Sequence, residues 1–371
     1  MRERVTAWVR EGFRVARGFQ LSQRNQTAAY LVLLAALSVG CYFLPDVQFD
    51  RMAYAATVAT LRYDNPKTVS DLAFSVLPVS AKDSSPYISD LALNPYHLLE
   101  QEPFYSVKPV YVEAIYLLWR LGFSIGVAIH LLSVVPFFGI GVLLLVWTRR
   151  PFPAFLLMLM PLTLWLGRLD TPDGLSTLVV LAGFLTLARG RVAVAILLLT
   201  LSVWVRTDNS LVVGVLLLWL LAQRKMRLFH GAAVFVLTAV SVLTIQHFGY
   251  SWGTLLRHSF LGHTAALGEV TWHFSLRDYL AVLKMGLRSS PVDTNFAMLA
   301  LLGALLWRLR KAWRPCLALI PGVLVVRYAL FPMPDDRYYA WAYLLVWIGL
   351  VQVFSPRDGD ERHIPLNWTE P

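Results

Sequence analysis

The chain has 371 residues, of which 57% are hydrophobic and 15% are charged, and its 33 Lys and Arg exceed its 23 Asp and Glu by 10. Soluble globular chains contain about 45–50% apolar and about 25% charged residues, so this composition excludes an ordinary soluble protein. The two cysteines, Cys41 and Cys316, lie in apolar stretches, where we interpret them as packing residues and not as a redox pair.

The N-terminal segment, residues 1–26, alternates arginine with apolar residues at near-helical spacing. This pattern is typical of a cytoplasmic amphipathic helix on the inner membrane surface, and a basic tail that only directs insertion has the same pattern. No small-residue cleavage site follows the first apolar block, so we expect residues 27–44 to remain as a membrane span.

Apolar blocks with almost no charge recur along the chain, and about 20 such residues cross the ~30 Å hydrocarbon core of a bilayer. We therefore predict an all-α integral membrane protein with about ten transmembrane helices, the short ones extending into flanking polar residues. The blocks occupy residues 27–44, 124–147, 151–167, 174–188, 192–205, 209–222, 229–247, 294–307, 315–331 and 338–354.

The orientation follows from the short loops, because those that keep arginine and lysine stay on the cytoplasmic side. Both termini, including the tail 355–371, are then cytoplasmic, and the membrane domain 27–354 sends two long segments, 45–123 and 248–293, to the outer face. We expect a bacterial inner-membrane location. Topology thus explains the positive charge without a nucleic acid.

The first outer segment carries two candidate features. Asp50 follows the first span and precedes Tyr54, and a carboxylate held at a bilayer surface is a candidate general base; an acid that caps an interfacial helix has the same sequence. Lys108-Pro109 precedes the amphipathic run Val112–Leu121, which is too short to span and suits a helix on the outer surface.

Two turns between later spans collect charge. Asp170 and Asp173 follow the third block, where they either cap the next helix or face the same cavity as Asp50. Arg206 and Asp208 repeat the arrangement one hairpin later, where a local salt bridge is the alternative interpretation.

The last two spans add arginines at their outer ends, namely Arg327 and, beside Tyr338, Arg337. Arginine binds phosphate bidentately and stays charged when partly desolvated, so this pair indicates an anionic head group. Snorkelling to ordinary lipid phosphates is the competing interpretation. The second outer segment mixes aromatic and basic residues, which suits a pair of surface helices lining a groove, and its histidines match no zinc-binding spacing.

In their order and sidedness these motifs resemble the GT-C superfamily of integral membrane glycosyltransferases, which take a sugar from a polyprenyl-phosphate carrier at the outer face. The resemblance implies that Asp50 deprotonates the acceptor hydroxyl and that Lys108 and Arg337 neutralise the donor phosphate, with inversion at the sugar. Arg206 and Arg327 are further phosphate-binding candidates. Supporting roles are implied for Tyr54, Asp170, Asp173, Asp208 and Tyr338.

The chain also departs from the superfamily pattern. Asp50 is followed by Arg51 where many members have a second acid, two Asp precede Arg337, and we expect no C-terminal soluble domain. The resemblance favours chemistry without a metal, while a divalent cation held by Asp50, Asp170 and Asp173 stays open. The expected partners are the lipid-linked donor, membrane lipid and a glycan, lipid or protein acceptor.

Two other classes compete with this interpretation. A transporter or lipid-linked-sugar flippase places polar, broken helices near the midplane, often in two matching halves. The sequence has no repeated halves, and its spans carry little charge apart from His130. A non-catalytic subunit of a polysaccharide-assembly complex also stays open.

Overall fold

The structure is a computed structural model that describes residues 23–78, 85–262, 264–267, 275–289, 299–304, 314–333 and 335–354. These residues form helices joined by turns and short loops, with no β-strand among them. The all-α class is therefore confirmed for this part of the chain. The predicted basic segment falls outside the described residues up to residue 22, and the tail 355–371 falls outside entirely.

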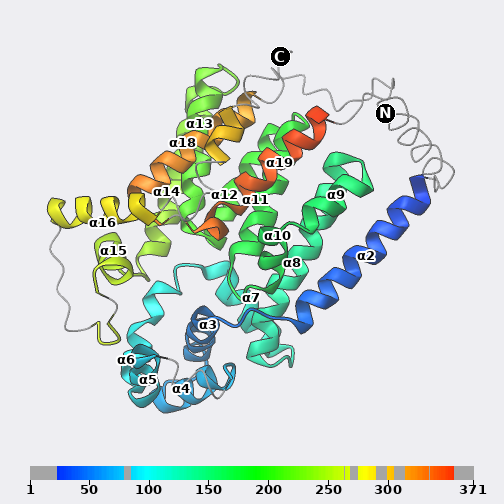
Figure 1. The fold of residues 1–371 in the computed structure, drawn as a ribbon. Coiled ribbons are helices and arrows are strands. Elements are labelled where there is room, and N and C mark those ends of the chain that lie inside the picture. Colours follow the sequence, from blue (N-terminus) through cyan, green and yellow to red (C-terminus); the bar gives the residue numbers. More distant parts are fainter. Residues whose placement is uncertain are drawn as a thin grey trace, which may run out of the picture.

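The predicted apolar blocks coincide with helices, apart from block 294–307, of which only residues 299–304 are described. The helices are α2 (Gln23–Phe43), α8 (Ile125–Thr148), α9 (Pro151–Met158), α10 (Pro161–Arg168), α11 (Asp173–Ala188), α12 (Val192–Val205), α13 (Ser210–Ala222), α14 (Leu228–Gln246), α18 (Arg314–Leu330) and α19 (Ala340–Phe354). They pack side by side as a bundle (Figure 1).

Three of these helices, α2, α8 and α14, are long and apolar enough to cross a membrane. The third predicted block is two helices, α9 and α10, bent by 66° at their junction, and counts as a fourth crossing if the pair is one span. The bend follows from Pro161, which begins α10 and holds Met160 in an extended conformation. The apolar helices support membrane association, while the count of ten stays a prediction.

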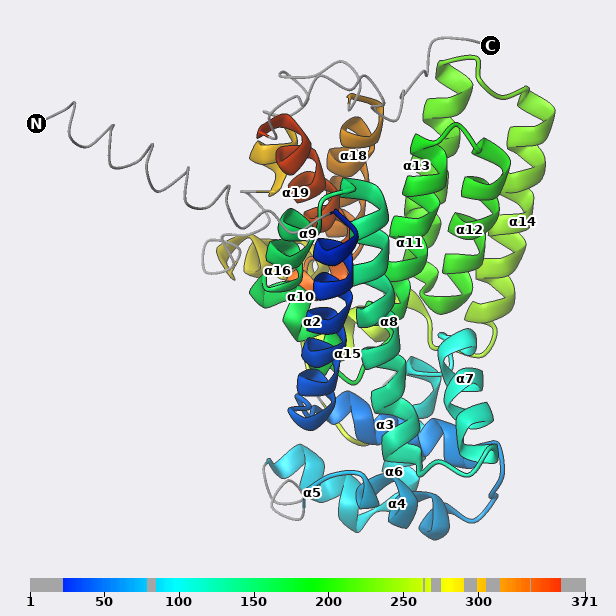
Figure 2. The ribbon, with the colours of Figure 1, turned by 90° about the vertical axis from the view of Figure 1, so that its right-hand side faces the viewer.

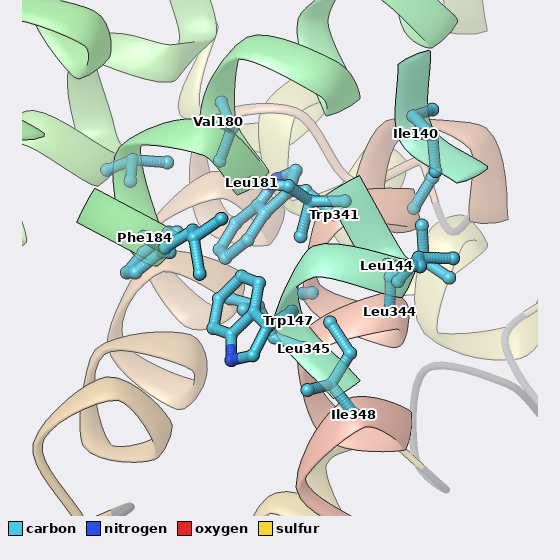
Figure 3. Packing of buried hydrophobic residues seen from close by; sticks show 14 of the residues in the cluster. Ile140, Leu144, Trp147, Val180, Leu181, Phe184, Trp341, Leu344, Leu345 and Ile348 are labelled. Atoms are coloured by element: carbon cyan, nitrogen blue, oxygen red, sulfur yellow. The ribbon is translucent and has the colours of Figure 1, made fainter. Parts of the chain in front are cut away.

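The bundle core lies where α8, α11 and α19 meet (Figure 3). Phe184 and Trp341 stack with ring centroids 5.8 Å apart and an interplanar angle of 11°, and Trp147 packs in the same cluster. Gly183 allows α11 to approach α12, because a Cβ there would come within 2.7 Å of the Leu199 side chain. Such close packing fixes the ends of the helices that carry the polar residues.

A second group of helices, which we call the cap, covers one end of the bundle (Figure 2). It contains α3 (Phe49–Thr60), α4 (Pro66–Ser75), α5 (Pro86–Leu93), α6 (Pro95–Glu100) and α7 (Pro109–Arg120). Proline stands in the first turn of α4 to α7, as its fixed φ and missing N–H favour. Every residue from Met52 to Ala59 is buried, so α3 is the centre of the cap.

The predicted short helix after Lys108-Pro109 is α7, whose 12 residues extend about 18 Å. The second long segment contributes α15 (Trp252–Phe260) and α16 (Leu276–Ser289), which lie at the flank of the bundle (Figure 1). The two expected helices are thus present, and the groove between them stays a prediction.

The cap is tied to the bundle beside Asp50. An isolated parallel bridge pairs Asp46 with Leu169, and the Asp46 N–H donates to the Arg168 carbonyl at 2.9 Å. The Trp165 indole N–H also donates to the Asp46 carboxylate at 2.7 Å. The chain leaving α2 is therefore fixed against the chain leaving α10 just before α3 begins.

Candidate active site

Asp50 lies in the first turn of α3 and points its two carboxylate oxygens at different partners. Its Oδ1 accepts a hydrogen bond from the Tyr105 hydroxyl at 3.0 Å, and its Oδ2 pairs with Arg337 Nη1 at 3.0 Å. The N-cap of α3 is Gln48, and it makes no side-chain capping bond. The interpretation of Asp50 as a helix cap is therefore wrong, because its carboxylate joins a long-range contact.

Arg337 lies in the short 3-10 helix η5 (Asp336–Tyr339), and its contact with Asp50 joins the segment before α19 to α3. Its Nε pairs with Asp335 at 2.8 Å, and its Nη2 donates to the Tyr338 hydroxyl at 3.1 Å. Burial alone would lower the pKa of Arg337, but Tyr338, Asp50 and Asp335 outweigh it and raise the pKa above its ordinary value. Arg337 is therefore a permanent cation with 14% of its side chain exposed.

Three guanidinium groups surround the ring of Tyr338, and we call this set the arginine cluster. The Cζ atoms of Arg206, Arg327 and Arg337 lie 4.7, 4.7 and 4.9 Å from the ring centroid. They come from the end of α12, the last turn of α18 and η5. Cation–π contacts at this distance are attractive, so one aromatic ring gathers cations from three elements.

Carboxylates offset the charge of the arginine cluster. Arg206 pairs with Asp173 and, at 3.1 Å, with Asp208, whose other oxygen lies 2.6 Å from Arg327 Nη2. Burial would raise the pKa of Asp208, but the two arginines hold it well below its usual range. The predicted local salt bridge between Arg206 and Asp208 is present, and it belongs to a network that joins α11, α12 and α18.

Lys108 precedes α7 and donates from Nζ to the Phe104 carbonyl at 2.7 Å. The nitrogen lies 5.0 Å from the Tyr105 ring centroid and 5.6 Å from that of Tyr54. Burial lowers the pKa of Lys108 to about 8, against the opposing effect of Asp50. Lys108 thus shares Tyr105 with Asp50, and its hydrogen bond goes to a neutral carbonyl.

Tyr54 forms a wall of the site through its aromatic ring. Its ring packs edge to face on Tyr105 at 4.9 Å and on Tyr111 at 4.8 Å. Burial, reinforced by Asp50, raises the pKa of both Tyr54 and Tyr105, so both stay neutral. These rings provide the apolar side of the site beneath Lys108.

A separate group, which we call the buried acid cluster, contains Asp170, Arg51 and His130. The Asp170 side chain is fully buried and pairs with Arg51 at 3.1 Å and with the His130 ring at 2.7 Å. The other His130 nitrogen faces the carbonyls of Cys41 and Tyr42 at the end of α2. The alternative in which Asp170 and Asp173 face the same cavity as Asp50 gains no support for Asp170, whose partners differ from those of Asp50.

Neither acid of this turn caps α11, because its N-cap is Pro172 and no side-chain capping bond is formed. Within the described ranges, no three or more His, Cys, Asp or Glu side chains are grouped closely enough to hold a metal ion. Asp50, Asp170 and Asp173 instead pair with three different arginines, Arg337, Arg51 and Arg206.

Two members of the site were missed from the sequence. Tyr105 binds Asp50 and lies between Lys108 and α3, and Asp335 holds the Nε of Arg337. Tyr105 lies in the stretch leading to Lys108-Pro109. The only sequence signal for its role in the site is an aromatic residue that follows the acidic residues Glu100 and Glu102. Asp335 departs from the superfamily pattern, and its position two residues before Arg337 is the sequence signal for this contact.

No protein-family model, curated protein or solved structure matches this chain. Its function is therefore inferred from the chemistry of the site.

Proposed function

We propose that this chain is a membrane glycosyltransferase that moves a sugar from a polyprenyl-phosphate donor to an acceptor hydroxyl at the outer face of a bacterial inner membrane. The observation that carries the proposal is the contact of Asp50 with Arg337 at 3.0 Å beside Lys108 and the rest of the arginine cluster. One place thus offers a carboxylate for a hydroxyl proton and several cations for a phosphate.

The proposed reaction is a single displacement. Asp50 accepts the proton of the acceptor hydroxyl as its oxygen bonds to the anomeric carbon of the sugar. The bond between that carbon and the phosphate oxygen breaks, and its electron pair leaves with the polyprenyl phosphate. Attack opposite the leaving group inverts the anomeric centre. Arg337 and Lys108 stabilise the negative charge that develops on the phosphate. Arg206 and Arg327 are further phosphate-binding candidates, and a phosphate that contacts them exchanges with their carboxylate partners, Asp173 and Asp208.

Arg337 has two roles in this proposal. Before the donor binds, it pairs with Asp50, and the donor phosphate takes over this contact and leaves the carboxylate for the acceptor. Tyr105 keeps one Asp50 oxygen in place during the exchange, because its hydroxyl donates to Oδ1 while Arg337 contacts Oδ2. The exchange therefore couples donor binding to release of the base.

The membrane arrangement is part of the proposal. We propose that the shorter helices α11, α12, α13, α18 and α19 cross the bilayer together with α2, α8 and α14, in the predicted ten-span topology with cytoplasmic termini. Support comes from their apolar composition and from their packing as one bundle. The cap would then face the outer side.

The test is transfer from a polyprenyl-phosphate sugar by the purified full chain in lipid nanodiscs. Asp50→Asn should lower the transfer rate by about 10²–10⁴-fold, the usual contribution of a general base. Asp71→Asn, an exposed position on α4, is the matched control and should retain the wild-type rate. Full activity of Asp50→Asn would contradict the proposal. Transport of a lipid-linked sugar across vesicles without any transfer would favour the flippase.

A further inference from the structure

One face of α16 is fixed to the outer end of α18. Val282 is fully buried, and the Tyr279 hydroxyl donates to the Ala329 carbonyl. Gly286 lies against Pro332, where a Cβ would come within 2.9 Å of the proline Cβ. These contacts are spread over two turns of α16, so the helix cannot rotate about its axis and the direction of its exposed face is determined.

The exposed face carries a stripe of leucines. Leu276, Leu280 and Leu287 are 61%, 52% and 55% exposed and are spaced by four and seven residues. Residues with this spacing lie on one side of an α-helix. An apolar stripe on a helix that lies across the flank of the bundle (Figure 1) is not part of a long apolar span.

A stripe of cations runs beside the leucines. Arg277, Lys284 and Arg288 are exposed and are spaced by seven and four residues, which places them about a quarter of a turn from the leucine stripe. Met285 lies about half a turn from Leu276 and Leu287. The exposed surface of α16 is therefore divided into an apolar strip, a basic strip and, beyond the basic strip, a third side at Met285 that faces away from the leucines.

Aromatic residues border the same surface. The Trp252 indole of α15 lies 6.0 Å from the Tyr279 ring and donates to the Leu330 carbonyl at 2.7 Å. Trp and Tyr are enriched at the level of lipid head groups, where an amphipathic ring contacts both acyl chains and water. The end of the apolar helix α18 and this aromatic pair thus both place α16 at the level of the lipid head groups.

We propose that α16 is an interfacial helix that binds the anionic phospholipids of the leaflet at this end of α18. The leucine stripe contacts acyl chains, and the basic strip contacts lipid phosphates. Charge complementarity selects this occupant, because three cations beside a narrow apolar strip match a layer of phosphates above acyl chains. The proposal concerns a surface away from Asp50 and does not rest on the proposed reaction.

The test measures the depth of spin labels on the full chain in nanodiscs of phosphatidylcholine with or without phosphatidylglycerol. Cys41 is 4% exposed and stays in place, while Cys316→Ser removes the second thiol. Labels are attached at Leu280→Cys and Leu287→Cys, with Met285→Cys as the control on the opposite side. Collisions with oxygen report lipid, and collisions with a water-soluble nickel chelate report solvent.

The oxygen-to-nickel ratio should be several-fold higher at positions 280 and 287 than at 285. Equal, solvent-like ratios at the three positions would overturn the proposal. Shielding of position 280 from both reagents would also overturn it, because protein and not lipid would then cover the stripe.

The basic strip is tested by charge removal. The triple variant Arg277→Gln, Lys284→Gln, Arg288→Gln should lose the increase in lipid exposure at position 280 that phosphatidylglycerol produces in the parent chain, since each cation near an anionic surface strengthens its attraction about fivefold. Removing three cations at Arg224, Lys225 and Arg227, between α13 and α14, is the matched control and should leave the increase intact. Equal loss in both triple variants, or in neither, would overturn the role of the basic strip.

Discussion

Two neighbouring residues of α3 enter two different ion clusters. Arg51 belongs to the buried acid cluster, where Asp170 is fully buried and also contacts His130. Asp50 belongs to the candidate site, where its side chain is 24% exposed and pairs with Arg337. The same kinds of residue therefore meet in both places, at different depths.

The difference in depth determines what each pair contributes. A charge that is fully removed from water destabilises the fold unless its partner is complete, so losing one member of the buried acid cluster is costly. A pair that still reaches solvent contributes little to stability and can be exchanged for a ligand. We therefore expect the Asp170 pair to stabilise the fold and the Asp50 pair to act in function, and the following predictions test that division.

The largest effect is expected for Asp170→Asn. The substitution keeps the shape of the side chain but leaves Arg51 without its counter-charge, so the free energy of unfolding should fall by about 3–5 kcal/mol. Thermal or denaturant unfolding in detergent measures this loss. Asp71→Asn, on the surface of α4, should stay within about 0.5 kcal/mol of the wild type. Equal stabilities of the two variants would contradict the division.

Arg337→Gln should have the opposite profile. We expect the transfer rate to fall about 10²–10³-fold, as for loss of one preorganised donor to a developing negative charge. The free energy of unfolding should change by at most about 1 kcal/mol, because the Asp50 pair is partly exposed. Arg51→Gln is the matched comparison, and its main effect should be a lower free energy of unfolding. An Arg337 variant that loses stability but keeps the wild-type transfer rate would contradict the division between a stabilising and a functional pair.

A smaller effect is expected from titration of Lys108, whose pKa burial lowers from 10.5 to about 8. Its charge is present below that pH and lost above it, so affinity for a phosphate-bearing donor should fall about tenfold between pH 7 and pH 9. In the unfolded chain this lysine keeps its proton to about pH 10.5. The unfolded state therefore binds more protons between pH 8 and 10.5, and this group makes stability rise with pH in that window.

Lys108→Arg provides the control, because arginine stays protonated throughout the range. Donor binding and unfolding are followed across the same pH series. Both pH dependences should disappear in the variant. Persistence of the fall in donor affinity would assign it to another group.

The smallest effect is expected for Tyr338→Phe. The ring keeps its contacts with the arginine cluster, while the hydrogen bond from Arg337 Nη2 to the hydroxyl is lost. One such bond contributes about 1 kcal/mol, so donor affinity should fall about fivefold. Tyr338→Leu removes the ring as well and should weaken binding further. Identical affinities for the two variants would show that the ring itself does not organise the cluster.

The helices were predictable because they depend on local composition. The ends of α8 and α14 lie within two residues of the predicted blocks, since charged loops and turn residues flank each apolar run. The number of crossings was not determined in the same way. Helices such as α13 are only 13 residues long, and short apolar helices are compatible with a span or with a buried position.

The partners of the site residues were harder to predict. The resemblance brought Asp50 and Arg337 together as members of one site, and the structure places them in contact. The divergence of Asp170 and Asp173 had no sequence signal. It arises because α3 presents Arg51 to one acid while the end of α12 presents Arg206 to the other, which depends on how distant helices pack.

The contact between Asp50 and Arg337 joins residues separated by 287 positions. During synthesis α3 leaves the ribosome early, whereas η5 is made only after α18. Asp50 is therefore without its arginine partner while the intervening helices insert, and it acquires that partner once η5 has emerged. A chain interrupted before η5 would lack both this pair and the core helix α19, so the candidate site is completed only late in biogenesis.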